Sequence, residues 1–215
     1  MSQPPTPSVV PIGESTWGYR LSRALTHAML ATWNRCRVEG REHLPEGAAV
    51  LVGNHQSFLD IPLVAAACRP RHVVFVARAS LAKSRFMDIV MKRCRAILIE
   101  RESSDRAAMR EILANLEEGH LVCVFPEGTR GEDGLVGEFR GGALLAARRS
   151  GAPLVPMGLC GMHRILGREH RFPRPAQARA RIGVPLGPDT PLEELRRTVA
   201  ELAGAPLAPL AAPKA

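Results

Sequence analysis

The sequence has few aromatic residues and no long apolar run, and each shortage removes a class of protein. Aromatic residues make up 4% of the 215 positions, and they do not alternate with basic residues as base-stacking surfaces do, so we expect no nucleic-acid partner. Charged residues interrupt every apolar stretch well short of the roughly 18 residues that a membrane-spanning helix needs. No basic-then-apolar leader opens the chain, which favours a cytoplasmic protein.

Cysteine is present, but its pattern argues against disulfides and metal sites. The five cysteines are odd in number, widely spaced and without a C-x-x-C pair. Cys68, Cys123 and Cys160 lie in apolar runs, which is typical of reduced core residues. We therefore predict no metal site and a reducing environment.

Positive charge is plentiful, and nearly all of it is arginine. The formal net charge is +8, and of the 29 basic residues only those at 83, 92 and 214 are lysine. This balance suits a polyanionic partner, whether that is an anionic membrane surface, a phosphorylated substrate or nucleic acid. Arginine-rich composition can equally reflect genome base content, so charge alone does not choose a function.

Short apolar or β-branched runs alternate with helical patterns along most of the chain. Strands are predicted at 48–53, 72–77, 96–100, 121–125, 153–159 and 178–184. Helices are predicted between them, including 104–118 and a helix at 190–203 that starts with a capping box of Thr190, Pro191 and Glu193. The alternation predicts an α/β fold, a single domain with a central, largely parallel sheet flanked by helices.

The two ends of the chain differ from this pattern. Residues 1–13 and 205–215 are rich in proline, alanine or serine and are predicted to be disordered tails, which leaves the α/β domain at 38–204. Residues 14–37 have the pattern of an amphipathic helix, with Trp17 and Arg20 among its interfacial positions. Such a helix can lie in a membrane interface or pack on the domain's own core.

The conspicuous polar residues come directly after predicted strands. In open α/β sheets, ligands bind outside the carboxyl ends of the strands, because the loops there converge on one edge. The sequence therefore predicts a functional rim formed by His55, Asp60, Arg78, Arg101, Glu127 and Arg130.

The segment NHQSFLD places a histidine and a carboxylate five positions apart. An imidazole can accept a proton near neutral pH, and a carboxylate on its other nitrogen fixes the tautomer. If Ser57 starts a helix, the turn can fold Asp60 back toward His55 as the partner of a general base. Alternatively, Asp60 only complements the helix N-terminus, and the spacing leaves both interpretations open.

Three arginines on one rim, Arg78, Arg101 and Arg130, would repel one another unless an anion lies among them. Planar guanidinium groups bind phosphate oxygens in pairs, so a phosphate monoester is a suitable ligand. In the segment PEGTR, Gly128 lets backbone amides approach that ligand, and Glu127 can orient an arginine or bind a ligand hydroxyl. The alternative is that Arg78 and Arg101 are ordinary solvated strand ends.

Taken together, NHQSFLD and the later FPEGTR resemble two motifs of the glycerolipid acyltransferases, of the 1-acyl-glycerol-3-phosphate (lysophosphatidate) acyltransferase type. The segments ILIER, EFRGGA and APLVPMGLCG agree with lesser blocks of that family. The resemblance implies that His55 is the general base and Asp60 its orienting partner. It further implies that the acceptor is bound by Arg101, Glu127, Gly128, Thr129 and Arg130, with Arg78 at a basic position of the family.

The implied reaction transfers a fatty acyl group from acyl-CoA or acyl-carrier protein to the free hydroxyl of lysophosphatidate, as in phospholipid biosynthesis. It needs no metal, no cofactor beyond that co-substrate and no covalent acyl-enzyme. An acyl-carrying nucleophile at Ser57 or Cys123 is disfavoured, because Ser57 suits a helix cap and Cys123 lies within a strand. The expected location is the cytoplasmic face of a membrane, as a peripheral protein whose partners are anionic lipid, the acyl donor and the lysophospholipid.

Two alternatives stay open. The family usually has a proline and glycines where this chain has Arg85, Asp88 and Arg95, and aspartate is commoner at the position of Glu100. The resemblance places these departures by the acceptor pocket and the acyl path, so the first alternative is the same chemistry on glycerol 3-phosphate, a lyso-amino-lipid or another hydroxylated lipid. The second is a non-catalytic basic module that binds nucleic acid or an anionic membrane through its arginines, and it predicts that replacing His55 leaves function intact.

Overall fold

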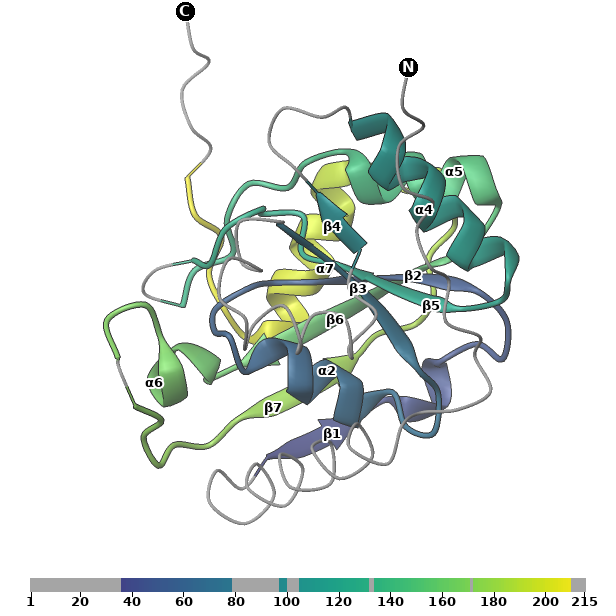
Figure 1. Cartoon of the computed structure of the whole chain (residues 1–215). Helices are drawn as coiled ribbons and strands as arrows, with labels where there is room; N and C mark the ends of the chain where they lie inside the picture. The colour runs from purple at the N-terminus through teal and green to yellow at the C-terminus, as the bar shows by residue number, and fades with distance from the viewer. Residues whose placement is uncertain (1–35, 79–96, 100–104, 132–133, 171, 210–215) are drawn as a thin grey trace, which may run out of the picture.

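Within the described residues, seven strands form one sheet in the order β1-β7-β6-β2-β5-β3-β4 (Figure 1). The computed structural model describes residues 36–78, 97–99, 105–131, 134–170 and 172–209. All strand pairs are parallel except β6 with β7. The strands are β1 Arg37–Glu39, β2 Ala49–Gly53, β3 Val73–Arg78, β4 Ile97–Ile99, β5 Leu121–Val124, β6 Leu154–Cys160 and β7 Arg179–Ile182.

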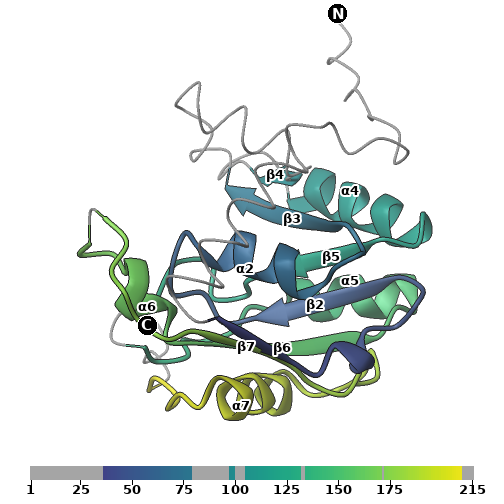
Figure 2. The same cartoon turned by 90° about the horizontal axis from the view of Figure 1, so that it is seen from below.

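Helices cover both faces of this sheet (Figures 1 and 2). The helices are η1 Arg41–His43, α2 Asp60–Ala67, α4 Asp105–Glu117, α5 Gly142–Ser150, α6 Met162–Leu166 and α7 Leu192–Ala203. One apolar cluster joins α2 and α6 to the sheet, and a second joins α4, α5 and α7 to its opposite face. The sheet is therefore the middle layer of three.

Strand β2 lies at the centre and supplies both clusters. Its five residues are all buried, and their side chains alternate between the faces: Leu51 belongs to the cluster with α2, and Val50 and Val52 to the cluster with α4. A strand covered on both faces reads as a continuous apolar run rather than an alternating one. The run AAVLVG is explained by this central position.

The predicted fold class, an α/β domain with a largely parallel central sheet, is confirmed by this architecture. The six predicted strands correspond to β2 through β7. Strand β1 was not predicted, because three residues of the sequence RVE carry no apolar run. Its place at the sheet edge, paired with β7, depends on a tertiary contact.

Two local predictions are wrong. The capping box at the start of α7 is absent: the helix begins at Leu192, and the Thr190 hydroxyl donates to the Gly187 carbonyl instead of capping the helix. The C-terminal tail also starts later than residue 205, because the Pro206 carbonyl accepts from the Val136 amide and the Ala208 amide donates to the Val136 carbonyl. Proline and alanine content therefore does not prevent residues 206–208 from forming an isolated bridge with the backbone of Val136.

The predicted amphipathic helix up to residue 35 and the tails at 1–13 and 210–215 lie outside the described residues. Among the helices that the structure does describe, none is both long enough and apolar enough to cross a bilayer.

Candidate active site

The sheet order brings the two predicted motifs together. Strands β2 and β5 are parallel neighbours with Val52 opposite Val124, so the loops that follow them leave the same edge of the sheet. NHQSFLD follows β2, and FPEGTR follows β5. Figure 2 shows the arrowheads of β2 and β3 pointing toward the side of the sheet where α6 lies.

His55 and Asp60 form a direct pair. His55 Nδ1 lies 2.8 Å from Asp60 Oδ2, and the Asp60 side chain is 0% exposed. The same oxygen accepts the backbone amides of Gln56 at 2.6 Å and Ser57 at 2.8 Å. A carboxylate in this position assigns the proton to Nδ1 and leaves Nε2 as the proton acceptor. The pair has the geometry of a general base and its orienting partner.

The geometry joins the two interpretations of Asp60 that the spacing left open. Asp60 is the first residue of α2, and its carboxylate caps the backbone amides of the preceding turn while it also holds the imidazole. The other oxygen, Oδ1, is buried and has no hydrogen-bond partner within the described part of the chain. Oδ2 therefore makes all the hydrogen bonds observed for this carboxylate.

Ser57 does not start the helix, which corrects the sequence-based prediction. Helix α2 begins at Asp60 with Leu59 as its N-cap residue, and no side chain caps it. The Ser57 hydroxyl accepts the Leu59 amide at 3.1 Å and donates to the Leu166 carbonyl at 2.8 Å. Because Leu166 ends α6, Ser57 ties the turn at residues 55–60 to the helix that follows β6. This bond uses the hydroxyl proton, which disfavours Ser57 as a nucleophile.

His55 is also fixed through its backbone and its ring face. Its amide donates to Glu127 Oε1 at 3.0 Å, and its carbonyl accepts from the Gly131 amide at 2.7 Å. The ring stacks on Phe125, with centroids 4.4 Å apart and an interplanar angle of 17°. The first residue of FPEGTR thus supports the histidine of NHQSFLD, and aromatic faces stabilise a cation that lies over them.

Glu127 faces inward, and its hydrogen-bond partners are backbone amides. Its side chain is 8% exposed and accepts the amides of His55 and Gly137. Burial raises the pKa of Glu127 to about 7, although the two amide hydrogen bonds oppose that shift. Among the described residues no arginine pairs with Glu127, so the prediction that it orients an arginine finds no contact here. Its observed contacts hold His55 in place.

The loop that encloses Glu127 is fastened from two directions. Gln56 Nε2 donates to the Gly134 carbonyl at 3.1 Å. Arg196, buried in α7, donates to the Gly137 carbonyl at 2.8 Å and to the Val136 carbonyl at 3.2 Å. A side-chain carbon at Gly137 would lie 3.0 Å from Glu127 Oε2, so glycine keeps the fit close.

The remaining residues of FPEGTR form the outer part of the site. Gly128 has a φ of +67° in the turn, a conformation that favours glycine. Thr129 is exposed and lines a surface hollow of about 340 Å³ with Glu127 and Arg140. The Arg130 guanidinium carbon lies 3.8 Å from the centroid of the Phe58 ring. The outer part is therefore open to solvent and to a ligand.

Of the other two predicted arginines, Arg78 and Arg101, the structure describes only the backbone of Arg78. Arg78 is the last residue of β3, which pairs with β5, and its side chain is outside the described part. Arg101 lies wholly outside it. The predicted group of three guanidiniums on one rim stays a prediction for these two residues.

Sequence reasoning missed several residues that build the site. Asn54 is fully buried and bonds the Leu159 backbone twice: its Oδ1 accepts from the amide at 2.7 Å, and its Nδ2 donates to the carbonyl at 3.0 Å. Phe58 and Phe125 contact Arg130 and His55 across the two motifs. Their signal was present, since each motif contains one phenylalanine beside its charged residues, but the partners are chosen by the sheet order.

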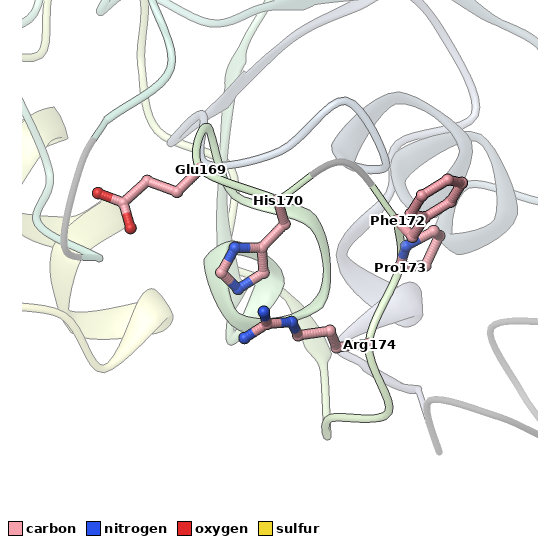
Figure 3. Close-up of a pocket in the computed structure, with 5 residues that line it drawn as sticks. All are labelled: Glu169, His170, Phe172, Pro173 and Arg174. Carbon is pink, nitrogen blue, oxygen red and sulfur yellow. The ribbon is translucent and has the colours of Figure 1, made fainter.

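A second hollow of about 340 Å³ lies on the loop after α6 and is lined by Glu169, His170, Phe172, Pro173 and Arg174. In Figure 3 the His170 ring and the Arg174 guanidinium lie on the same side of the loop, whereas Glu169 points away from them. The histidine and the glutamate of this hollow therefore do not form a pair like His55 and Asp60. None of these five residues was predicted as functional.

The described cysteines are free thiols. Burial raises the pKa of Cys123 well above its usual value, and raises that of Cys68 to about 12. A thiol that stays protonated is a poor nucleophile, so Cys123 does not suit an acyl-carrying role. In the part of the chain that the structure describes, no group of three or more histidine, cysteine, aspartate or glutamate residues could hold a metal ion.

The comparisons with known proteins agree on one family. A sequence model of the family described as Acyltransferase matches residues 35–160. A chloroplastic 1-acyl-sn-glycerol-3-phosphate acyltransferase of Arabidopsis thaliana is 31% identical over 136 residues, which is 61% of this chain and 38% of that protein. The 1-acyl-sn-glycerol-3-phosphate acyltransferase of Borreliella burgdorferi is 32% identical over 125 residues, 57% of this chain and 50% of that protein. The matched part thus spans half or less of the length of these relatives.

A solved structure is also similar. The crystal structure of the 1-acyl-sn-glycerophosphate acyltransferase of Thermotoga maritima superposes with a TM-score of 0.70 and 27% sequence identity, covering 86% of this chain and 76% of that one. The similarity thus extends beyond the two motifs to most of the domain.

Proposed function

The chain belongs to the acyltransferase family, and from this premise we propose that it transfers a fatty acyl group to the free hydroxyl of 1-acyl-glycerol 3-phosphate. The donor is a thioester, either acyl-CoA or acyl-carrier protein. The relatives named as 1-acyl-sn-glycerol-3-phosphate acyltransferases support this choice of acceptor.

The observation that carries the proposal is the 2.8 Å contact between His55 Nδ1 and the buried Asp60 Oδ2. Asp60 holds the proton of His55 on Nδ1, so Nε2 is left to accept the proton of the acceptor hydroxyl. That oxygen then attacks the thioester carbonyl, and the buried carboxylate stabilises the imidazolium that forms. General-base catalysis of this kind contributes roughly 10²–10⁴-fold to the rate.

Collapse of the tetrahedral intermediate breaks the carbon–sulfur bond. The proton that His55 took from the hydroxyl is then available for the leaving thiolate, so the imidazole ends the cycle neutral. The stacked Phe125 ring supports the charged form of His55 between these two steps. Every covalent change occurs between the two substrates, and the protein only moves one proton.

The acceptor phosphate is assigned to the outer part of the site. Arg130 offers a guanidinium at the edge of the catalytic turn, and the Gly128 turn and Thr129 lie beside the hollow that could hold the headgroup. Arg78 and Arg101 belong to the same proposal as further cationic positions. Paired guanidinium hydrogen bonds to phosphate would orient the glycerol hydroxyl toward His55.

We propose further that the protein works as a peripheral protein on the cytoplasmic face of a membrane. Its acceptor is a membrane lipid, and its net charge of +8 suits an anionic surface. Residues 14–37, with Trp17, Arg20 and Arg23, are the proposed contact. Binding to vesicles should rise with anionic lipid and fall with added salt, and indifference to both would count against this contact.

The test is an assay of acyl transfer from a long-chain acyl-CoA to lysophosphatidate by the wild type and by His55→Ala. We expect turnover in the wild type and loss of at least about a hundredfold in the variant, with the same thermal unfolding midpoint in both proteins as a control for folding. Wild-type activity that survives His55→Ala would contradict the mechanism.

One alternative acceptor class follows from the departures at residues 85–95 and Glu100. Glycerol 3-phosphate, a lyso-amino-lipid or another hydroxylated lipid would use the same His55 chemistry. A wild type that is inactive with lysophosphatidate, tested with both donors, but active with one of these acceptors would select the alternative.

A further inference from the structure

Arg130 has an unusual environment for a cation at a protein surface. Its guanidinium carbon lies 3.8 Å from the centroid of the Phe58 ring, so one face of the guanidinium is covered by an aromatic side chain. Phe58 is itself 43% exposed, which is high for a large apolar residue. The two residues come from different motifs, one after β2 and one after β5.

No carboxylate forms an ion pair with Arg130 within the described part of the chain. Burial lowers the pKa of Arg130 most, the like charge of Arg168 lowers it further, and the charge of Asp60 raises it. Arg168 follows α6, and the end of α6 is tied to the catalytic turn by the bond between the Ser57 hydroxyl and the Leu166 carbonyl. A guanidinium whose charged form is disfavoured by burial and by a neighbouring cation is stabilised when an anion binds to it.

Stacking and anion binding use different parts of a guanidinium. The ring of Phe58 interacts with the flat face, whereas the N–H donors point outward in the plane of the group. Stacking therefore leaves the N–H edge available for phosphate, and it removes the freedom of a long side chain to turn away. Pre-ordering of this kind reduces the entropy that is lost on binding.

We propose that Phe58 is a positioning residue that holds the Arg130 guanidinium in place for the phosphate group of the acceptor. This inference rests on the proposed function, because it names the group that orients one of its substrate-binding residues. It assigns a role in acceptor recognition to the position directly after Ser57 in the turn that carries His55 and Asp60.

The position of Phe58 links recognition to chemistry. The turn from His55 to Asp60 is rigid, because the Asp60 carboxylate accepts three hydrogen bonds from it. A phosphate held by Arg130 over Phe58 is therefore placed at a fixed distance from the imidazole. The acceptor hydroxyl is joined to that phosphate through the glycerol backbone, so its position relative to the imidazole is restricted as well.

The first test compares Phe58→Leu with Phe58→Tyr in the acyl-transfer assay at saturating donor. Loss of the stacked ring should raise KM for lysophosphatidate about two- to tenfold, which corresponds to the usual strength of a cation–π contact at a partly exposed site, and kcat should stay within about twofold. Tyrosine should restore the wild-type KM. Equal KM in Phe58→Leu and wild type, or equal damage from leucine and tyrosine, would overturn the proposal.

A matched control is the same leucine substitution at Phe172, which is 78% exposed on another loop (Figure 3) and should leave KM unchanged. A second control repeats Phe58→Leu in an Arg130→Met background. If Phe58 acts through Arg130, the added substitution should have no further effect on KM. A full additional increase would contradict the proposal.

A binding measurement separates this inference from the proposed function. Glycerol 3-phosphate should raise the thermal unfolding midpoint of the wild type, raise it less in Phe58→Leu and not at all in Arg130→Met. If this pattern appears in a protein that transfers no acyl group, the proposed reaction is wrong, but the proposed phosphate site at Arg130 and Phe58 is supported. If the wild type is active but both variants respond to glycerol 3-phosphate like the wild type, the proposed phosphate site at Arg130 and Phe58 is wrong.

Discussion

The inner part of the site, His55 with Asp60 and Glu127, and its outer part, Arg130 with Phe58 and Thr129, differ in how far the protein satisfies its own polar groups. In the inner part, one Asp60 oxygen accepts three donors and Glu127 accepts two amides. In the outer part, the Arg130 guanidinium lies against an aromatic ring, and Thr129 is exposed.

The difference follows from what each part has to do. A proton acceptor must have one orientation before the substrate arrives, and burying its supporting carboxylates achieves this at a cost in desolvation. A phosphate site must instead keep its donors free for the ligand, because a protein partner on Arg130 would have to be displaced. Three changes test this contrast, and they are given in order of decreasing expected effect.

Asp60→Asn should have the largest effect. Asparagine can place its oxygen where Oδ2 lies and still accept the three donors, while its amide nitrogen takes the place of the unpaired Oδ1. The geometry would be kept and the charge lost, so we expect kcat to fall roughly 10²–10⁴-fold with KM for lysophosphatidate little changed. Steady-state kinetics measures both. A kcat within threefold of the wild type would show that the reaction does not require the negative charge of Asp60.

Glu127→Gln should change how stability depends on pH. The pKa of Glu127 is raised to about 7 from an ordinary 4.5, so its contribution is fully present below about pH 4.5 and is lost as pH rises through about 7. Glutamine does not ionise. Relative to wild type, the free energy of unfolding of the variant should therefore improve by up to about 3 kcal/mol between pH 4.5 and pH 8.

Urea unfolding at both pH values measures this difference. Glu201→Gln, at an exposed position of α7, is the matched control and should show no such change. The prediction would be contradicted if the difference in unfolding free energy between Glu127→Gln and the wild type were the same at both pH values. The Glu127 carboxylate would then not be desolvated, as the contrast between the inner and outer parts of the site requires.

Arg130→Met should act on binding rather than on chemistry. Loss of charge-assisted hydrogen bonds to phosphate, at about 1.5–3 kcal/mol, predicts a KM for lysophosphatidate about ten- to a hundredfold higher, with kcat within a few-fold of the wild type. Arg130→Lys should fall between, because it keeps the charge but not the planar fork. A fall in kcat equal to the rise in KM would break the separation between inner and outer parts.

The fold was predictable in its class because that class depends on local patterns. Runs such as LVCVF and helical segments such as residues 105–117 are marked by their own apolar spacing, and they appear where predicted as β5 and α4. Two of the errors concern single side chains with more than one possible partner. The Thr190 hydroxyl bonds Gly187 rather than the start of α7, and the Ser57 hydroxyl bonds Leu166 rather than the start of α2.

The site was predictable in its residue types but not in its contacts. The spacing of His55 and Asp60 allowed a direct pair, and the structure contains it. The inward turn of Glu127 and the stacking of Phe58 and Phe125 could not be derived, because each joins the loop after β2 to the loop after β5.

By itself, the sequence determined which elements form and which chemical groups follow them, because periodicity and turn residues act over a few positions. Only the tertiary structure decided that β5 lies beside β2, and thus that Glu127 reaches the backbone of a histidine 72 residues earlier. Strand order depends on the packing of helices against both faces of the sheet, which involves residues far apart in the sequence. It therefore brings residues of both motifs together around the imidazole, and residues of both motifs into the outer part that stays open for a ligand.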